Sequence, residues 1–415
     1  MRAVTEIGWI DFSKEDREKV LDVINLLQEQ GAVDELGIGQ IRDAFANRFF
    51  PGTSTVQTRA KYFFLVPYIM REATTGLYGN QLSSILKRID QEEKDCALRL
   101  FNRCKEHNIN PVGIGIIGAR VLPGGGWVAR KPSSIYWNGI QTYGICRQPG
   151  VSIHDLIRGS IYQRNREKSL ELGNRNDDKP ERERDDADAG KDEAIRFFDL
   201  PECAYGPWRE GLSIRLTNEE ANFLKYRIES SVPHSLFGFV LRNEIDLTKY
   251  TSFEAMTADL SDSVPKDTAH LMKLACDFNC LVYLARIRYN LILSDGKNKE
   301  ACSEWERLRK ELPKQCQADL EEIFSSLHIS NFKLGRFLFG LKEHLLSGDE
   351  AAVDALIVGR EIELKTKSRA KLCHKEDYPP EKWVGGKMLD YRLSNASQIA
   401  SDIRAGRAAN VSDKQ

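Results

Sequence analysis

The stretch that decides the fold runs Phe50-Pro51-Gly52-Thr53-Ser54-Thr55-Val56-Gln57-Thr58-Arg59-Ala60-Lys61-Tyr62-Phe63-Phe64. Apolar spacing before it predicts a helix over 38–49, and Pro51-Gly52 ends that helix because proline lacks the amide proton a helix needs. Thr53 or Ser54 then begins another helix, since a hydroxyl accepts hydrogen bonds from the free amides of a first turn. The sequence therefore predicts two helices joined by a short turn.

Polar side chains gather at the start of the second predicted helix. Helix, short turn and helix is the plan that many DNA-binding proteins use to place a helix in the major groove. The residues expected to contact phosphates or base edges are Thr53, Ser54, Gln57, Thr58, Arg59 and Lys61. An equally physical alternative keeps them inside the protein, with Thr53 and Ser54 as helix caps and Arg59 paired with Glu35 or Asp43.

A glycine-rich region follows over residues 111–131, where glycines alternate with isoleucine and valine. This alternation predicts two short strands joined by a glycine turn. Such a hairpin would end in Arg130-Lys131 and could serve as the wing of a winged helix, with both cations on phosphates. Pro132-Ser133-Ser134 then begins a helix that runs to Tyr143.

The other predicted elements are also helices. Lys14–Glu29 and Leu82–Lys105 have apolar residues at helical spacing, and Ser13 can cap the first of them. Thr217 and Glu220 form the pattern of a capping box, in which the two side chains satisfy each other's amides. The further predicted helices span 267–293, 299–312, 318–327, 331–346 and 350–372.

A change in composition marks the main domain boundary. Residues 163–193 hold 8 Lys or Arg and 11 Asp or Glu with few apolar side chains, which is typical of a disordered linker. We therefore predict an N-terminal domain over 1–160, a linker over 161–195, a helical domain over 196–346 and a basic helical segment over 347–415. The predicted fold is mainly α, a helical bundle whose N-terminal part resembles a winged helix, with a helical C-terminal domain.

Composition narrows the class of protein. The 415 residues are 41% hydrophobic and 29% charged with a net charge of −1, so any basic surface must be local. No apolar run approaches the roughly 20 residues of a membrane span, and the start of the chain lacks the plan of a signal peptide. We expect a cytoplasmic protein with no membrane contact.

Most motifs of catalysis or cofactor binding are missing. The nine cysteines form no CxxC pair and the seven histidines stand apart, so we expect reduced thiols, no metal and no cofactor. Residues 113–118 match GxGxxG by letter, but Pro111 and Pro123 leave no room for the strand and helix that a dinucleotide site requires. No GxxxxGK[ST], HExxH or GxSxG occurs.

One pattern keeps an enzyme hypothesis open. Glu361-Ile362-Glu363-Leu364-Lys365 contains an E-x-K triplet, with Asp354 upstream. Metal-dependent nucleases place such a triplet on a strand, where carboxylates hold Mg²⁺ and the lysine meets the phosphate. The alternative is a charged helix with pairing between residues four apart, which these residues also fit.

A basic run follows the triplet and contains Lys365, Lys367, Arg369 and Lys371. Several cations on one short element release counterions when they bind DNA or RNA, so the run is a second candidate phosphate contact. The plainer interpretation is a solvated helix end, where cations complement the negative pole of the helix dipole.

Two motifs carry a resemblance to a known family. The FPGTST…TRAKYF run over 50–64, with Leu65–Met70 after it, and Lys131-Pro132-Ser133-Ser134-Ile135-Tyr136-Trp137 resemble an uncharacterised bacterial family, a domain of unknown function. Such proteins are similar to ones encoded beside helicases and phospholipase-D-like nucleases in phage-defence clusters of the Azaca type. The resemblance implies such a partner and transfers no catalytic residue.

Together these observations favour a binding protein over an enzyme. We predict a non-catalytic subunit that recognises nucleic acid, with DNA as the expected partner, or bridges to a helicase or phospholipase-D-like nuclease, in anti-phage defence. The first alternative is a cryptic Mg²⁺-dependent nuclease that uses Asp354, Glu361, Glu363 and Lys365. The second alternative is a purely structural scaffold.

Overall fold

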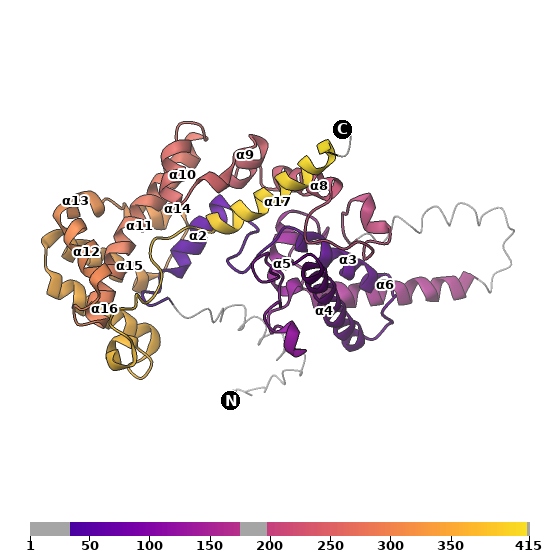
Figure 1. The fold of residues 1–415 in the computed structure, drawn as a ribbon, viewed down its shortest axis with the longest axis horizontal. Helices are drawn as coiled ribbons and strands as arrows, with labels where there is room; N and C mark the ends of the chain where they lie inside the picture. The colour runs from indigo at the N-terminus through magenta and orange to yellow at the C-terminus, as the bar shows by residue number, and fades with distance from the viewer. Residues whose placement is uncertain (1–33, 175–196, 413–415) are drawn as a thin grey trace, which may run out of the picture. The chain divides into compact units, whose positions relative to one another are not determined.

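The computed structural model describes residues 34–174 and 197–412 (Figure 1). Helices dominate both ranges, and the β-type pairing recorded in them is an isolated antiparallel bridge between Cys146 and Phe198. The prediction of a mainly α-helical protein is confirmed. The predicted helix over Lys14–Glu29 and residues 175–195 of the predicted linker lie outside the described residues.

Two compact units make up the chain, and each joins segments that are distant in sequence. The smaller unit comprises Met1–Ile41 and Asp277–Met388, and the larger comprises Arg42–Cys276 and Leu389–Gln415. Helices α2 (Gly39–Phe49) and α11 (Lys266–Leu293) contribute residues to both. The predicted domain ranges are consecutive, whereas these units are not.

Most of the helices belong to the larger unit. Its further elements are α3 (Tyr62–Thr74), α4 (Leu82–Glu106), η1 (Leu122–Gly124), α5 (Pro132–Thr142), α6 (Ile153–Asn174), η3 (Glu202–Tyr205), α8 (Asn218–Ser231), α9 (Leu236–Arg242), η4 (Leu247–Lys249), α10 (Phe253–Leu260) and α17 (Leu393–Ser412). Residues 161–174 of the predicted linker therefore lie in α6.

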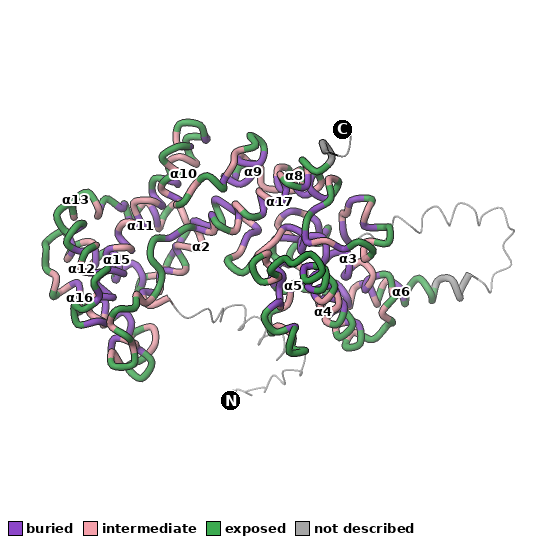
Figure 2. Tube along the Cα trace, viewed as in Figure 1, coloured by how far each residue is buried: buried purple, intermediate pink, exposed green. Residues whose placement is uncertain are grey.

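Helix α3 lies at the centre of the larger unit because almost all of its side chains are apolar and buried (Figure 2). Pro67 lies inside this helix without ending it. The helix packs on α4, α5 and α6, and the Phe63 ring lies 4.9 Å from that of Tyr136 and 5.2 Å from that of Tyr143. These aromatic contacts fix α5 on α3.

The smaller unit is built around a helical hairpin. Its further elements are α12 (Lys299–Leu308), η5 (Arg309–Glu311), α13 (Leu312–Gln315), α14 (Leu320–Ser326), α15 (Phe332–Ser347), α16 (Glu350–Lys365), η6 (Lys371–Cys373) and η7 (Lys375–Asp377). Gly348 ends α15 in the left-handed conformation, and the Asp349 side chain caps α16 by accepting from the Ala352 amide at 3.0 Å. This two-residue connection folds α16 back along α15.

Two local predictions are wrong. Residues 111–131 form turns and the short η1 helix instead of two strands, because Gly115 and Gly118 adopt positive φ angles and turn the chain. No β-hairpin wing forms in this region. Residues 53–61 form turns and irregular chain, and α3 begins at Tyr62, so neither Thr53 nor Ser54 caps it.

Candidate nucleic-acid interface

The polar residues of the 53–61 segment bond to neighbouring backbone groups of the larger unit. Thr53 Oγ1 donates to the Phe50 carbonyl at 2.6 Å, and Gln57 Nε2 donates to the Gly52 carbonyl at 3.1 Å. Thr58 Oγ1 donates to the Gly115 carbonyl at 2.7 Å, while the Ser54 amide donates to Gln57 Oε1 at 3.2 Å. Thr53 and Gln57 are buried. Their observed role is to hold the turn together.

Both cations of this segment have carboxylate partners within the larger unit. Arg59 Nη2 lies 2.7 Å from Asp402 Oδ1, and the other Asp402 oxygen accepts from the Ala60 amide at 2.8 Å. Lys61 Nζ lies 2.6 Å from Glu220 Oε1 and is buried. The ion pair suggested for Arg59 is present, but the partner is Asp402 rather than Glu35 or Asp43. DNA contact by these residues stays a prediction, and it would require breaking these pairs.

The cations at the end of the glycine-rich region are more accessible. Arg130 is exposed, and Lys131 Nζ lies 2.9 Å from Asp90 Oδ1 with both side chains more than a third exposed. Asp90 also accepts from Trp127 Nε1 at 2.9 Å, so it anchors the turn before α5.

Buried Glu361 anchors the basic run of the smaller unit. Its Oε1 accepts from Tyr289 at 2.8 Å and from Lys365 at 3.1 Å, and its Oε2 accepts from the Leu372 amide at 3.0 Å. Lys371 donates to Glu35 at 2.8 Å. Burial alone would raise the pKa of Glu35, but the hydrogen bond and charge of Lys371, a backbone hydrogen bond and the charge of Lys365 together outweigh burial, so the pKa is lowered. Lys365 and Lys371 therefore stabilise the fold.

The two remaining cations of the run have no such anchor among the described residues. Lys367 and Arg369 lie in the exposed turn after α16, and neither forms an ion pair with another described residue. Lys333, on the first turn of α15, lies at the same end of the hairpin, with its Nζ 3.5 Å from Glu363 Oε1. We call Lys333, Lys367 and Arg369 the hairpin-end patch.

Lys333 was not among the predicted site residues, although the sequence held a signal for it. The predicted helices over 331–346 and 350–372 are separated by Gly348, which is typical of an antiparallel pair. Folding one helix back on the other places residue 333 opposite residue 363 and so beside the basic run. Interpreting the pair as a hairpin would have added Lys333 to the candidate site.

The residues of the nuclease hypothesis lie on helix α16 rather than on the strand that hypothesis requires, and Lys365 pairs with Glu361 four residues before it, as the charged-helix alternative expects. Asp354 accepts two hydrogen bonds from Arg288, at 2.8 and 2.6 Å, and Glu363 Oε2 accepts from Arg360 at 2.8 Å. No cluster of three or more metal-ligating side chains occurs within residues 34–174 and 197–412. These carboxylates serve as ion-pair partners in the smaller unit.

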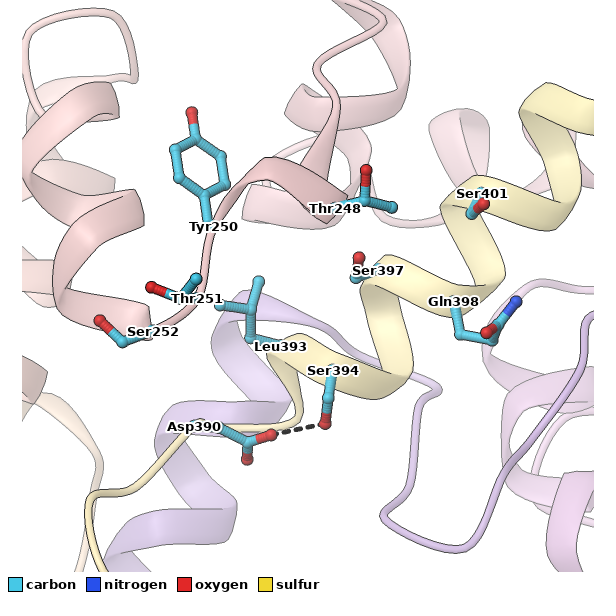
Figure 3. Close-up of a pocket in the computed structure, with 10 residues that line it drawn as sticks. All are labelled: Thr248, Tyr250, Thr251, Ser252, Asp390, Leu393, Ser394, Ser397, Gln398 and Ser401. Carbon is cyan, nitrogen blue, oxygen red and sulfur yellow. Dashed lines mark hydrogen bonds between the residues drawn. The ribbon is translucent and has the colours of Figure 1, made fainter. Parts of the chain in front are cut away.

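A polar pocket of about 340 Å³ lies in the larger unit, between α17 and the segment that joins η4 to α10 (Figure 3). Ser394, Ser397 and Ser401 line it from α17, and Asp390 accepts from Ser394 at 2.6 Å. Its lining contains no lysine or arginine. The pocket therefore lacks the cations that a phosphate would require.

An ion network borders a second pocket in the same unit. Arg209 lies 2.6 Å from Glu72 and 2.8 Å from Glu92, and it stacks on Trp208. Burial alone would raise the pKa of Glu72, but its hydrogen bonds from Arg209, Trp208 and Tyr78 outweigh burial and lower it. Arg88 Nη2 also lies 2.6 Å from Glu92 Oε1, so two arginines balance two glutamates, and the network stabilises the fold without attracting a polyanion.

One known protein family matches part of the chain. Residues 4–191 match a protein family described as a family of unknown function, DUF6361. No curated protein and no solved structure matches the chain. None of the described helices has both the length and the apolar character needed to cross a membrane.

Proposed function

We propose that this chain is a non-catalytic protein that recognises nucleic acid through backbone phosphates, using the hairpin-end patch. The observation that carries the proposal is the pair Lys367 and Arg369, which are exposed and free of ion pairs among the described residues. A phosphate that binds these two side chains displaces water rather than a carboxylate. The free energy of counterion release is therefore not offset by the loss of an ion pair.

The turn that carries this pair is held at both ends. Lys365 and Lys371 anchor it through Glu35 and Glu361, and Ala370 is buried between them. Because the flanking backbone is fixed, Lys367 and Arg369 lose little conformational freedom on binding. An ordered pair of cations fits the regular spacing of phosphates better than a mobile tail does.

The surrounding charge is also favourable. Glu363, the ion-pair partner of Lys333, is already shared with Arg360 and Arg336, at 2.8 and 3.4 Å. The open end of the hairpin therefore carries more positive than negative charge, although the whole chain has a net charge of −1. This local excess attracts a polyanion.

Arg130 and Lys131 of the larger unit remain part of the proposal as a second, weaker contact. Lys131 would exchange Asp90 for a phosphate, so its contribution is smaller than that of an unpaired lysine. Bridging to a helicase or phospholipase-D-like nuclease in phage defence is proposed on the resemblance alone. Co-purification with the products of neighbouring genes tests that part separately.

The experiment measures the affinity of the full chain for labelled DNA and RNA by fluorescence anisotropy across a salt series. The variant Lys333→Gln/Lys367→Gln/Arg369→Gln removes the patch, and Lys299→Gln/Lys310→Gln/Lys314→Gln removes three exposed lysines of the same unit as a matched control. Because the patch variant neutralises three fewer phosphates of duplex DNA, its slope of log K against log salt should flatten by about 2.7.

The control should keep the wild-type slope within error. An equal flattening in both triple variants would show non-specific attraction and contradict the patch. No binding at low salt would favour the scaffold hypothesis. Addition of Mg²⁺ should leave the nucleic acid intact, and cleavage that is lost in Glu361→Gln would favour the nuclease.

A further inference from the structure

Helix α15 exposes an apolar stripe. Phe332, Phe339 and Leu346 are 80%, 43% and 48% exposed, and they follow one another at intervals of seven residues. The opposite face is buried, and α15 packs against α13, α14 and α16. The three large side chains therefore face outward at least in part, and the ring of Phe339 lies 6.3 Å from that of Phe324 in α14.

Two charged residues complete the same stripe. Arg336 and Glu343 are exposed, and together with the apolar residues they recur at steps of four, three, four and three. This spacing keeps all five side chains on one face and is the pattern of a coiled-coil seam. We call Phe332, Arg336, Phe339, Glu343 and Leu346 the α15 seam.

Two copies of the α15 seam are complementary when they run antiparallel. In an antiparallel pair centred on Phe339, Phe332 of one copy lies opposite Leu346 of the other, and Phe339 meets its own counterpart. Arg336 then lies within one residue of Glu343 of the second copy. Such a pattern fits a twofold interface, in which the same surface serves both partners.

Both charged groups are available for that contact. The Arg336 side chain is 65% exposed, and its ion pair with Glu363 is long at 3.4 Å. Glu343 is exposed and forms no ion pair with another described residue. We propose that two copies of this chain associate antiparallel through the α15 seam, with Phe339 at the centre and Arg336 paired with Glu343 across the interface.

A second copy fits this face better than a nucleic acid does. Glu343 and Leu346 would face the phosphates of a bound strand, one repelling them and the other offering no hydrogen bond. A seam of two heptads is short, so the dimer should be weak and its population should rise with protein concentration.

If the proposed function also holds, dimerisation would duplicate the hairpin-end patch. Lys333 of one copy would lie about 18 Å along the helix axis from Lys333 of the other, given a rise of 1.5 Å per residue. Two patches on one strand would raise the apparent affinity. This consequence rests on the proposed function, whereas the dimer itself does not.

Sedimentation velocity of the full chain over a wide concentration range tests the dimer. The wild-type protein should shift from monomer to dimer as concentration rises, and Phe339→Glu should stay monomeric. Leu77→Glu is the matched control, because Leu77 is 72% exposed but lies in the larger unit. It should dimerise as the wild type does. A wild type that stays monomeric throughout would overturn the proposal.

Charge exchange provides a test that does not depend on the folding of one variant. Arg336→Glu and Glu343→Arg should each weaken self-association, because each places like charges across the seam. An equimolar mixture of the two variants should recover the dimer, since both cross-seam pairs are then of opposite charge. Failure of the mixture to recover, with both variants folded by circular dichroism, would contradict the antiparallel arrangement.

Discussion

Lys61 and Glu220 form a buried ion pair between segments 159 residues apart, with Nζ 2.6 Å from Oε1. Glu220 also accepts from Tyr68 at 2.9 Å and from the Thr217 amide at 2.9 Å. One carboxylate therefore closes the capping box of α8 and holds the start of α3 against it. The residue expected to contact DNA is instead a link within the larger unit.

Removing one partner of this pair should be costly. Lys61→Met leaves Glu220 with no cation, so we expect a loss of about 3 to 5 kcal/mol in the free energy of unfolding. Chemical denaturation at neutral pH measures it. Lys131→Met is the control, since both side chains of its pair with Asp90 are more than a third exposed, and it should cost less than about 1 kcal/mol. Similar losses in both variants would show that burial does not distinguish the two pairs.

Glu93 should make stability depend on pH. It is buried, it accepts from the Ser133 amide at 2.6 Å, and burial raises its pKa from 4.5 to about 7, although the hydrogen bonds from Ser133 oppose that rise. Between these two values the folded protein holds the proton more tightly than the unfolded chain does. The contribution of Glu93 to stability is therefore present below pH 4.5 and falls as pH rises toward 7.

Glu93→Gln removes this loss while keeping one oxygen for the Ser133 amide. The free energy of unfolding of the variant should rise relative to that of the wild type by about 3 kcal/mol as pH rises from 5 to 8. Denaturation curves at several pH values give the difference directly. A difference that does not change with pH would mean that Glu93 does not titrate in this window.

The sequence predicted what is local and missed what is distant. The capping box of Thr217 and Glu220 is confirmed because both partners lie within one helical turn. Asp402 is 343 residues from Arg59, and no pattern in a single sequence connects them. The result is a segment whose residue types suit DNA contact but whose hydrogen bonds are made inside the protein.

The glycine-rich region differs from the predicted pair of strands for another reason. Glycines that alternate with isoleucine imitate the period of a strand, but Gly115 and Gly118 adopt φ angles of +87° and +86°. Positive angles turn the chain at each of these glycines, so no extended pair can form. The same alternation therefore fits two structures, and backbone geometry rather than side-chain pattern selects between them.

Two helical glycines should respond in opposite ways to alanine. A Cβ on Gly139 would lie 2.4 Å from the Gly52 carbonyl oxygen, whereas a Cβ on Gly159 would meet nothing within 4 Å. Gly139→Ala should therefore cost about 1 to 3 kcal/mol by overpacking. Gly159→Ala should stabilise α6 by about 0.5 to 1 kcal/mol through helix propensity. Thermal unfolding of the two variants should shift the midpoint in opposite directions, and a shared direction would contradict the close approach of α5 to Gly52.

Thr366 ends α16 in a conformation that suits glycine. Its φ of +66° and ψ of 158° are costly for a β-branched residue. Thr366→Gly should therefore stabilise the protein by about 1 kcal/mol, although it loses the contact of Oγ1 with Ser368 Oγ at 3.1 Å. Denaturant unfolding with an unchanged m-value measures the gain.

The matching control makes the opposite change, since it replaces a glycine of positive φ with a residue that has a side chain. Gly348 joins α15 to α16 at a φ of +73° with open space around it, so Gly348→Ala should lose stability through backbone strain alone. Thr366→Gly should also weaken nucleic-acid binding if the fixed backbone of the 366–371 turn contributes to affinity, because glycine returns conformational freedom beside Lys367 and Arg369. A variant that gains stability and keeps full affinity would show that the charges of the hairpin-end patch act without that preorganisation.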